Sequence, residues 1–104
     1  MQKQKQYTQY PNRPGIIIVR DRYSNHLFTM STDSIRARVQ AVDTDHVRGT
    51  IKQYPAGGWS EGRVRTANEA GVLVFEYVEM PNTERSVLKQ IASAMDSESL
   101  SKAA

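Results

Sequence analysis

Four consecutive β-branched residues, Ile16 to Val19, constrain the fold of this chain more than any other feature. β-Branched side chains favour an extended backbone. Because successive side chains of a strand point to opposite faces, an unbroken apolar run needs cover on both faces. The run therefore predicts a central strand, with Ile16 and Ile18 facing one layer and Ile17 and Val19 facing the other.

The remaining patterns predict an α+β domain with a three-stranded antiparallel sheet flanked by helices. Turn-forming residues follow the first apolar run, so residues 15–31 are expected to form an N-terminal β-hairpin. Residues 72–79 are rich in β-branched and aromatic side chains, which predicts the third strand. Helices are expected after a cap at Ser31 or Thr32, within residues 45–54, over residues 60–70, and from Pro81 onward.

Apolar stripes at helical spacing mark the first and the last of these helices. Their members are Ile35, Val39 and Val42 in the first helix, and Val87, Leu88, Ile91, Ala92 and Met95 in the last. We therefore expect a helix on each face of the sheet.

Composition divides the chain into an arm, one domain and a tail. Residues 1–13 mix Gln, Lys and Tyr without a core-forming periodicity and are expected to form a flexible arm. Residues 14–95 hold the strands and the apolar stripes and are expected to fold as a single α+β domain. Residues 96–104 are rich in Ser and Ala and are expected to fray.

The formal net charge of +3 lies in the arm, because Lys3, Lys5 and Arg13 account for it and the remaining charges balance. A sequence pI of about 9.4 indicates an anionic partner. A neutral body is nevertheless unlike a duplex-binding domain with a strong basic face. Arginine dominates the basic residues of the body, and its guanidinium suits phosphate contacts. The charge pattern favours nucleic acid slightly and leaves a solvated mixed-charge surface as the alternative.

The chain lacks the residues that several classes of protein require. It contains no cysteine, which excludes disulfide bonds and thiolate metal sites. The two histidines, His26 and His46, have no paired ligand at metal-binding spacing, so no metal and no cofactor is expected. No apolar run approaches the roughly 20 residues that span a bilayer, and the N-terminus does not resemble a signal peptide. We expect a cytoplasmic protein without membrane association.

Short motifs between residues 15 and 80 follow one another in an order that resembles a known nuclease family. The matching pieces are Gly15-Ile16-Ile17, Phe28-Thr29-Met30, Arg38 and the strand Val74–Glu79. They resemble the GIY-YIG nucleases, in which a β-hairpin carries two tyrosine motifs and the next helix carries an arginine. A third strand and a helix with a metal-binding glutamate follow. The resemblance implies this fold, and small members of this kind resemble phage or mobile-element proteins.

The positions that resemble the family's catalytic tyrosines hold Ile17 and Phe28. Neither side chain has a hydroxyl, so neither can act as an acid, a base or a hydrogen-bond donor. Glu84 is the only carboxylate near the start of the last helix, and it lies closer to the third strand than the family spacing implies. We therefore expect no catalytic residues and no bound metal.

Four arginines are the candidate nucleic-acid-binding residues: Arg36, Arg38, Arg63 and Arg65. The resemblance gives Arg38 the place of the family's arginine, which offsets phosphate charge. Alternatively, its methylene groups could cover the edge of the apolar stripe.

Tyr54 and Trp59 flank a Pro/Gly-rich loop and are the candidate partner-binding residues. An aromatic side chain beside arginines can stack on a base or anchor a protein partner. Alternatively, Trp59 folds back onto the core.

Three hypotheses for function follow. The first is a catalytically degenerate GIY-YIG-like domain that binds nucleic acid. The second is a small interaction or inhibitor protein that binds a protein partner through the loop from Tyr54 to Arg65. The third is an active nuclease with a rearranged site, which the loss of both hydroxyls disfavours. The sequence leaves the identity of the partner and the oligomeric state open.

Overall fold

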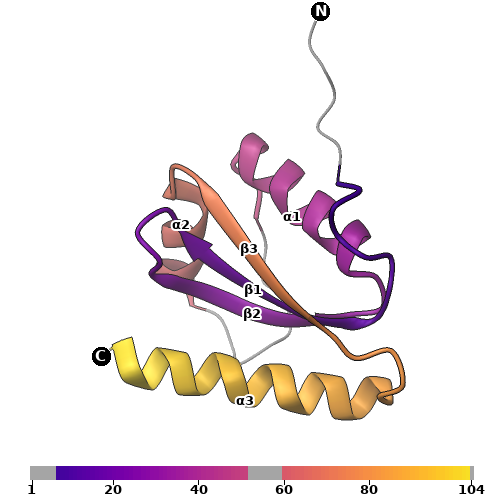
Figure 1. The fold of residues 1–104 in the computed structure, drawn as a ribbon. Coiled ribbons are helices and arrows are strands. Elements are labelled where there is room, and N and C mark those ends of the chain that lie inside the picture. The colour runs from indigo at the N-terminus through magenta and orange to yellow at the C-terminus, as the bar shows by residue number, and fades with distance from the viewer. Residues whose placement is uncertain (1–6, 52–59, 104) are drawn as a thin grey trace, which may run out of the picture.

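A three-stranded antiparallel sheet forms the centre of the molecule, with its strands in the order β2-β1-β3. The computed structural model describes residues 7–51 and 60–103. Its elements are β1 (Gly15–Asp21), β2 (His26–Thr32), α1 (Ile35–Arg48), α2 (Glu61–Glu69), β3 (Leu73–Glu79) and α3 (Arg85–Ala103). Helices α1 and α3 lie on opposite faces of the sheet (Figure 1). The predicted α+β fold with a hairpin and a third strand is confirmed.

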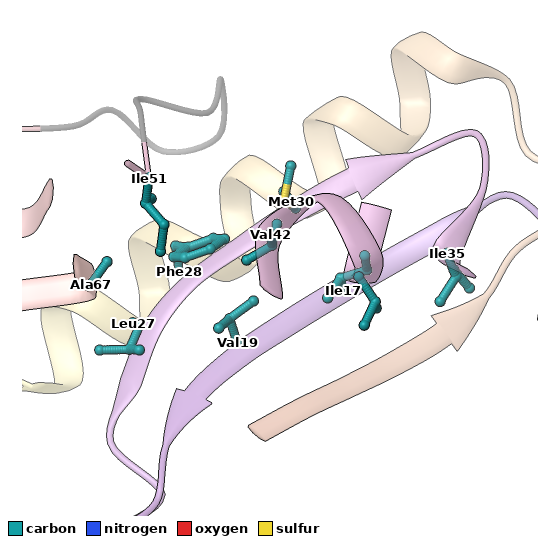
Figure 2. Packing of buried hydrophobic residues seen from close by; sticks show 10 residues of the cluster. Ile17, Val19, Leu27, Phe28, Met30, Ile35, Val42, Ile51 and Ala67 are labelled. Atoms are coloured by element: carbon teal, nitrogen blue, oxygen red, sulfur yellow. The ribbon is translucent and has the colours of Figure 1, made fainter. Parts of the chain in front are cut away.

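The apolar run of β1 supplies both faces of the core. Ile17 and Val19 are fully buried on the side of α1, in a cluster that includes Phe28 (Figure 2). On the opposite face, Ile16 packs against Leu88 and Ala92 of α3. The predicted alternation is thus confirmed for Ile16, Ile17 and Val19, whereas Ile18 is half-buried and belongs to neither cluster.

The apolar stripes behave differently in the two helices. Ile35, Val39 and Val42 of α1 are all fully buried, as their spacing predicts. In α3 the side chain of Val87 is 40% exposed, so its place in the predicted stripe is wrong. The buried line of α3 passes through Leu88 and Ala92 at intervals of one helical turn, and Val87 lies beside that line.

Helix α1 begins and ends at other residues than the sequence indicated. Its N-cap is Ser34, whose hydroxyl accepts a hydrogen bond from the backbone N–H of Ala37. The hydroxyl of Thr32 is instead paired with the backbone of Ser34. The helix continues to Arg48 and ends at Gly49, which has a left-handed backbone with φ of 68°. Residues 45–48 of the helix expected within residues 45–54 are therefore the last part of α1, and residues 52–54 lie outside the described residues.

Residues 7–13 pack against the domain, although the sequence placed them in a flexible arm. The carbonyl oxygens of Arg13 and Pro11 accept hydrogen bonds from the backbone N–H groups of Ile35 and Arg36, at 2.9 and 3.0 Å. These are donors of the first turn of α1, which have no partner within the helix. The ring of Tyr10 packs against β3. This segment is short and polar, so its role as a helix cap left no periodic signal.

The C-terminal region also differs from the expected tail. Helix α3 runs to Ala103, and the side chain of Asp96 is completely buried. A polar, Ser-rich composition hid this part of the helix, because its anchor is a charged side chain and not an apolar one.

At Gly15 the strand β1 comes very close to β3 and to α1. A substitution at this position therefore tests how tightly the three elements pack. A Cβ atom at Gly15 would lie 2.2 Å from the carbonyl oxygen of Val78 and 2.8 Å from Cδ1 of Ile35. We expect Gly15→Ala to lower the free energy of unfolding by about 1–3 kcal/mol, because the backbone of a paired strand cannot move aside easily. Urea denaturation measures this difference.

The matched control is Gly71→Ala, since a Cβ atom there has no neighbouring atom within 4 Å. Its effect should stay within about 0.5 kcal/mol. Equal stabilities of the two variants would contradict the close approach.

Candidate functional site

A pocket of about 250 Å³ lies at the end of β2, between the first turns of α1 and α3. We call it the basic pocket. It is lined by Met30, Ser31, Thr32, Asp33, Arg38, Arg85, Leu88 and Lys89. Figure 1 shows that α1 and α3 begin at this same end of the sheet, on its two faces. The pocket thus collects side chains from three elements that are far apart in the sequence.

The positions of the cationic residues along α1 and α3 explain why they meet at the pocket. Arg85 and Lys89 are separated by four residues of α3 and therefore share one face of the helix. Arg38 occupies the first turn of α1, where its backbone N–H bonds to the carbonyl oxygen of Ser34. The burial of Leu88 and Val39 beside these residues fixes how the two helices sit on the sheet.

The pocket is electropositive. Its charged groups are the side chains of Arg38, Arg85 and Lys89 and a single carboxylate, that of Asp33. Arg85 forms an ion pair with Asp33, and both side chains of this pair are more than half exposed. Exposed ion pairs of this kind contribute little to stability, so an incoming anion can compete for Arg85. The hydroxyl-bearing residues Ser31 and Thr32 also line the pocket.

The positions that resemble catalytic tyrosines lie outside this pocket. Ile17 is 0% exposed and Phe28 is 1% exposed, and both belong to the core between the sheet and α1. Glu84 immediately precedes α3, is exposed, and is not among the residues that line the pocket. Across residues 7–51 and 60–103, no three His, Cys, Asp or Glu side chains gather as a metal site.

The four arginines singled out from the sequence do not form one surface. Arg38 alone lines the basic pocket. Arg36 donates a hydrogen bond from Nε to the carbonyl oxygen of Tyr10, at 2.8 Å, and so fastens the N-terminal segment to α1. Arg65 is exposed on α2. Tyr54 and Trp59 lie outside the described residues.

Arg63 forms a buried ion pair with Asp96 and is not available to a ligand. Nη1 donates to Oδ2 of Asp96 at 2.8 Å, and Nη2 donates to Oδ1. Nε and Nη2 donate to the carbonyl oxygen of Leu27 at 3.2 and 3.1 Å. The backbone N–H of Thr29 donates to Oδ1 of Asp96 at 2.9 Å. This network joins α2 and α3 to β2, which gives Arg63 a structural role.

His26 completes this buried cluster. Its Nε2 lies 2.8 Å from the hydroxyl of Thr29 and 3.6 Å from Oδ1 of Asp96, and its side chain is 6% exposed. Its Nδ1 is buried without a hydrogen-bond partner. Burial lowers the pKa of His26, the charge of Asp96 opposes this shift, and the charges of Arg63 and Arg20 add to it. A protonated ring would carry a buried N–H at Nδ1 without an acceptor, so the neutral ring suits the fold.

The sequence analysis missed Arg85, Lys89 and Asp96. Arg85 and Lys89 carried a readable signal, because two cations four residues apart share one face of a helix. Asp96 lies at the spacing of Leu88 and Ala92 on the same face of α3. A carboxylate on an apolar helix face predicts a buried ion pair, and that signal was available in the sequence.

Comparison with protein families and with curated proteins found no relative of this chain. No protein-family model matches the chain, and no curated protein shows significant similarity to it. Within the part of the chain that the structure describes, no helix is both long and apolar enough to cross a bilayer.

Because His26 is buried, we expect the free energy of unfolding to depend on pH. The pKa of His26 in the folded protein lies below its ordinary value of about 6.5 in an unfolded chain. Below about pH 6.5 the unfolded chain gains a proton that the folded protein resists. The contribution of His26 to stability is therefore present above this pH and is lost on acidification toward the lower pKa of the folded state. Urea denaturation between about pH 7.5 and pH 5 should show the decrease.

The comparison for this test is His26→Gln, which cannot titrate. Its free energy of unfolding should change less over the same pH range, whatever its stability at neutral pH. A wild-type protein that becomes more stable on acidification, or a variant with the same slope, would contradict the assignment.

Proposed function

We propose that the protein is a catalytically degenerate GIY-YIG-like domain that binds nucleic acid through the basic pocket. The observation that carries the proposal is the convergence of Arg38, Arg85 and Lys89 on one cavity. Guanidinium and ammonium groups bind phosphate oxygens through charge-assisted hydrogen bonds. An electropositive cavity in a body without net charge concentrates this affinity at one place.

The order of the elements supports the resemblance. A hairpin of β1 and β2 is followed by α1 with Arg38, and later by β3 and α3. Arg38 thereby stands at the mouth of a cavity, on the helix that carries the arginine in the GIY-YIG nucleases. This position favours phosphate binding over a purely packing role for the side chain.

The chemistry of cleavage has no evident source at this site. Ile17 and Phe28 supply neither a proton nor a hydrogen bond, and each lost proton-transfer group lowers a rate by roughly 10²–10⁴-fold. The carboxylate of Asp33 is paired with Arg85. A domain with these residues keeps the means to bind a phosphate and lacks the groups that would activate water.

Nucleic-acid binding is tested with purified protein and fluorescently labelled single- and double-stranded DNA. We expect binding that weakens as salt increases, because each phosphate contact contributes about −0.7 to −0.9 to the slope of log K against log salt. Arg38→Ala and Lys89→Ala should each weaken binding to every sequence and reduce the slope by about 1. Fluorescence anisotropy at several salt concentrations measures both quantities.

The matched control is Arg48→Ala, an exposed arginine at the opposite end of α1. It removes the same charge and should change the slope much less than Arg38→Ala. Arg63→Ala is unsuitable, since it would leave the buried Asp96 without its partner. If the wild-type protein fails to bind DNA at low salt, the proposal is wrong and the protein-partner hypothesis becomes the better one.

Cleavage is tested on the same preparations with supercoiled plasmid and single-stranded DNA. We expect no nicking in the presence of magnesium or manganese, because the two tyrosine positions hold Ile17 and Phe28. Agarose gel electrophoresis with a commercial nuclease as the positive control measures the outcome. Metal-dependent nicking that disappears in Arg38→Ala would show an active, rearranged site instead.

A further inference from the structure

A second cavity, of about 320 Å³, lies on the α1 side of the sheet, where the N-terminal segment passes β3. We call it the aromatic pocket. Its wall contains three aromatic side chains, Tyr7, Tyr10 and Phe75, and a single charged residue, Asp43. It shares no lining residue with the basic pocket, so the two sites can be tested separately.

Asp43 is the acidic residue that lines this cavity. It lies on the buried side of α1, is 9% exposed, and accepts a hydrogen bond of 2.6 Å from the hydroxyl of Tyr7. Burial raises the pKa of Tyr7 to about 12, with further contributions from the hydrogen bond to Asp43 and from its charge. The pKa of Tyr10 is also raised, first by burial and then by the charge of Asp43. The carboxylate therefore acts on two of the three rings.

The aromatic wall is held in place before any ligand binds. The ring of Tyr10 packs edge-on against Phe75, with centroids 6.3 Å apart, and against Tyr77, at 5.9 Å. The backbone of Tyr10 is fastened to α1 by the hydrogen bond from Arg36. A preformed site loses little conformational freedom when a ligand enters.

A third cavity, of about 440 Å³, adjoins the aromatic pocket and shares Asp43 and Leu73 with it. His46 and Asn68 give this neighbouring space polar walls. The two cavities fall near the lower end of the range of about 300–1,000 Å³ that is usual for small-molecule sites. The aromatic pocket can hold a compact head group, and the adjoining space can hold a polar tail.

We propose that the aromatic pocket binds small organic ammonium ions, with Asp43 as the counter-charge and the rings of Tyr7, Tyr10 and Phe75 around the cationic head. Aromatic rings attract such cations through their quadrupole, and they tolerate the apolar groups attached to the nitrogen. A buried carboxylate adds a charge that a neutral ligand of the same shape cannot use. The proposal is independent of nucleic-acid binding at the basic pocket.

The test is a titration of the full chain, followed by ¹H–¹⁵N NMR, with choline and with its neutral isostere 3,3-dimethylbutan-1-ol. We expect choline to shift the amide signals of residues around Tyr10, Asp43 and Phe75 in a saturable way. The neutral alcohol should bind about tenfold more weakly or worse, since it lacks the charge that the carboxylate and the rings attract. Equal binding of both compounds, or shifts confined to other parts of the chain, would overturn the proposal.

Two variants and one control sharpen the result. Asp43→Asn keeps the shape of the side chain and should abolish the preference for choline over the alcohol. Glu69→Gln removes an exposed carboxylate from α2 and should leave the preference unchanged. If Asp43→Asn does not fold, Tyr10→Leu replaces it, with an expected loss of choline affinity of about tenfold. Unchanged choline affinity in a folded Asp43→Asn or Tyr10→Leu protein would also overturn the proposal.

Discussion

The pairing of β1 with both of its neighbours is the interaction on which the rest of the structure depends. Every residue of this strand from Gly15 to Asp21 has a partner in β3, and most have one in β2. With both edges hydrogen-bonded, the strand exposes only its side chains, and their apolar character requires cover on both faces. Helix α1 provides this cover on one face and α3 on the other (Figure 1). The positions of the two helices, and of the pocket between their first turns, follow from that requirement.

The buried ion pair of Arg63 and Asp96 is a second interaction that holds the elements of the fold together. Helix α2 buries one apolar residue, Ala67, and so has little apolar surface with which to attach to the sheet. Arg63 compensates by reaching the carbonyl oxygen of Leu27 in β2 and the carboxylate of Asp96 in α3. Removing one partner of such a pair costs roughly 3–5 kcal/mol, because the other charge remains buried. One of the four arginines that the sequence predicts to bind nucleic acid thus holds the fold together.

The two pockets differ in the kind of ligand that their chemistry can recognise. The basic pocket lies at the end of the edge strand β2 and presents the cations Arg38, Arg85 and Lys89, whose chemistry suits an anionic ligand. The aromatic pocket lies on the other side of β1, near β3, and combines rings with a buried carboxylate. The two pockets carry opposite charges and share no lining residue. The segment of residues 7–13 contributes to the second site, which ties that site to the first turn of α1.

The sequence by itself determined the strands, the apolar face of α1 and the absence of hydroxyls at Ile17 and Phe28, because these depend on local periodicity and residue type. It also indicated Arg38 as a residue of the candidate site. Only the tertiary structure decided which arginines face a cavity, since Arg63 lies against the carboxylate of Asp96 and Arg38 lines the basic pocket. The same holds for residues 7–13, whose polar backbone caps a helix that begins more than twenty residues later along the chain. Contacts between distant segments set the roles of Arg63 and of residues 7–13, and the local pattern around these residues does not record those contacts.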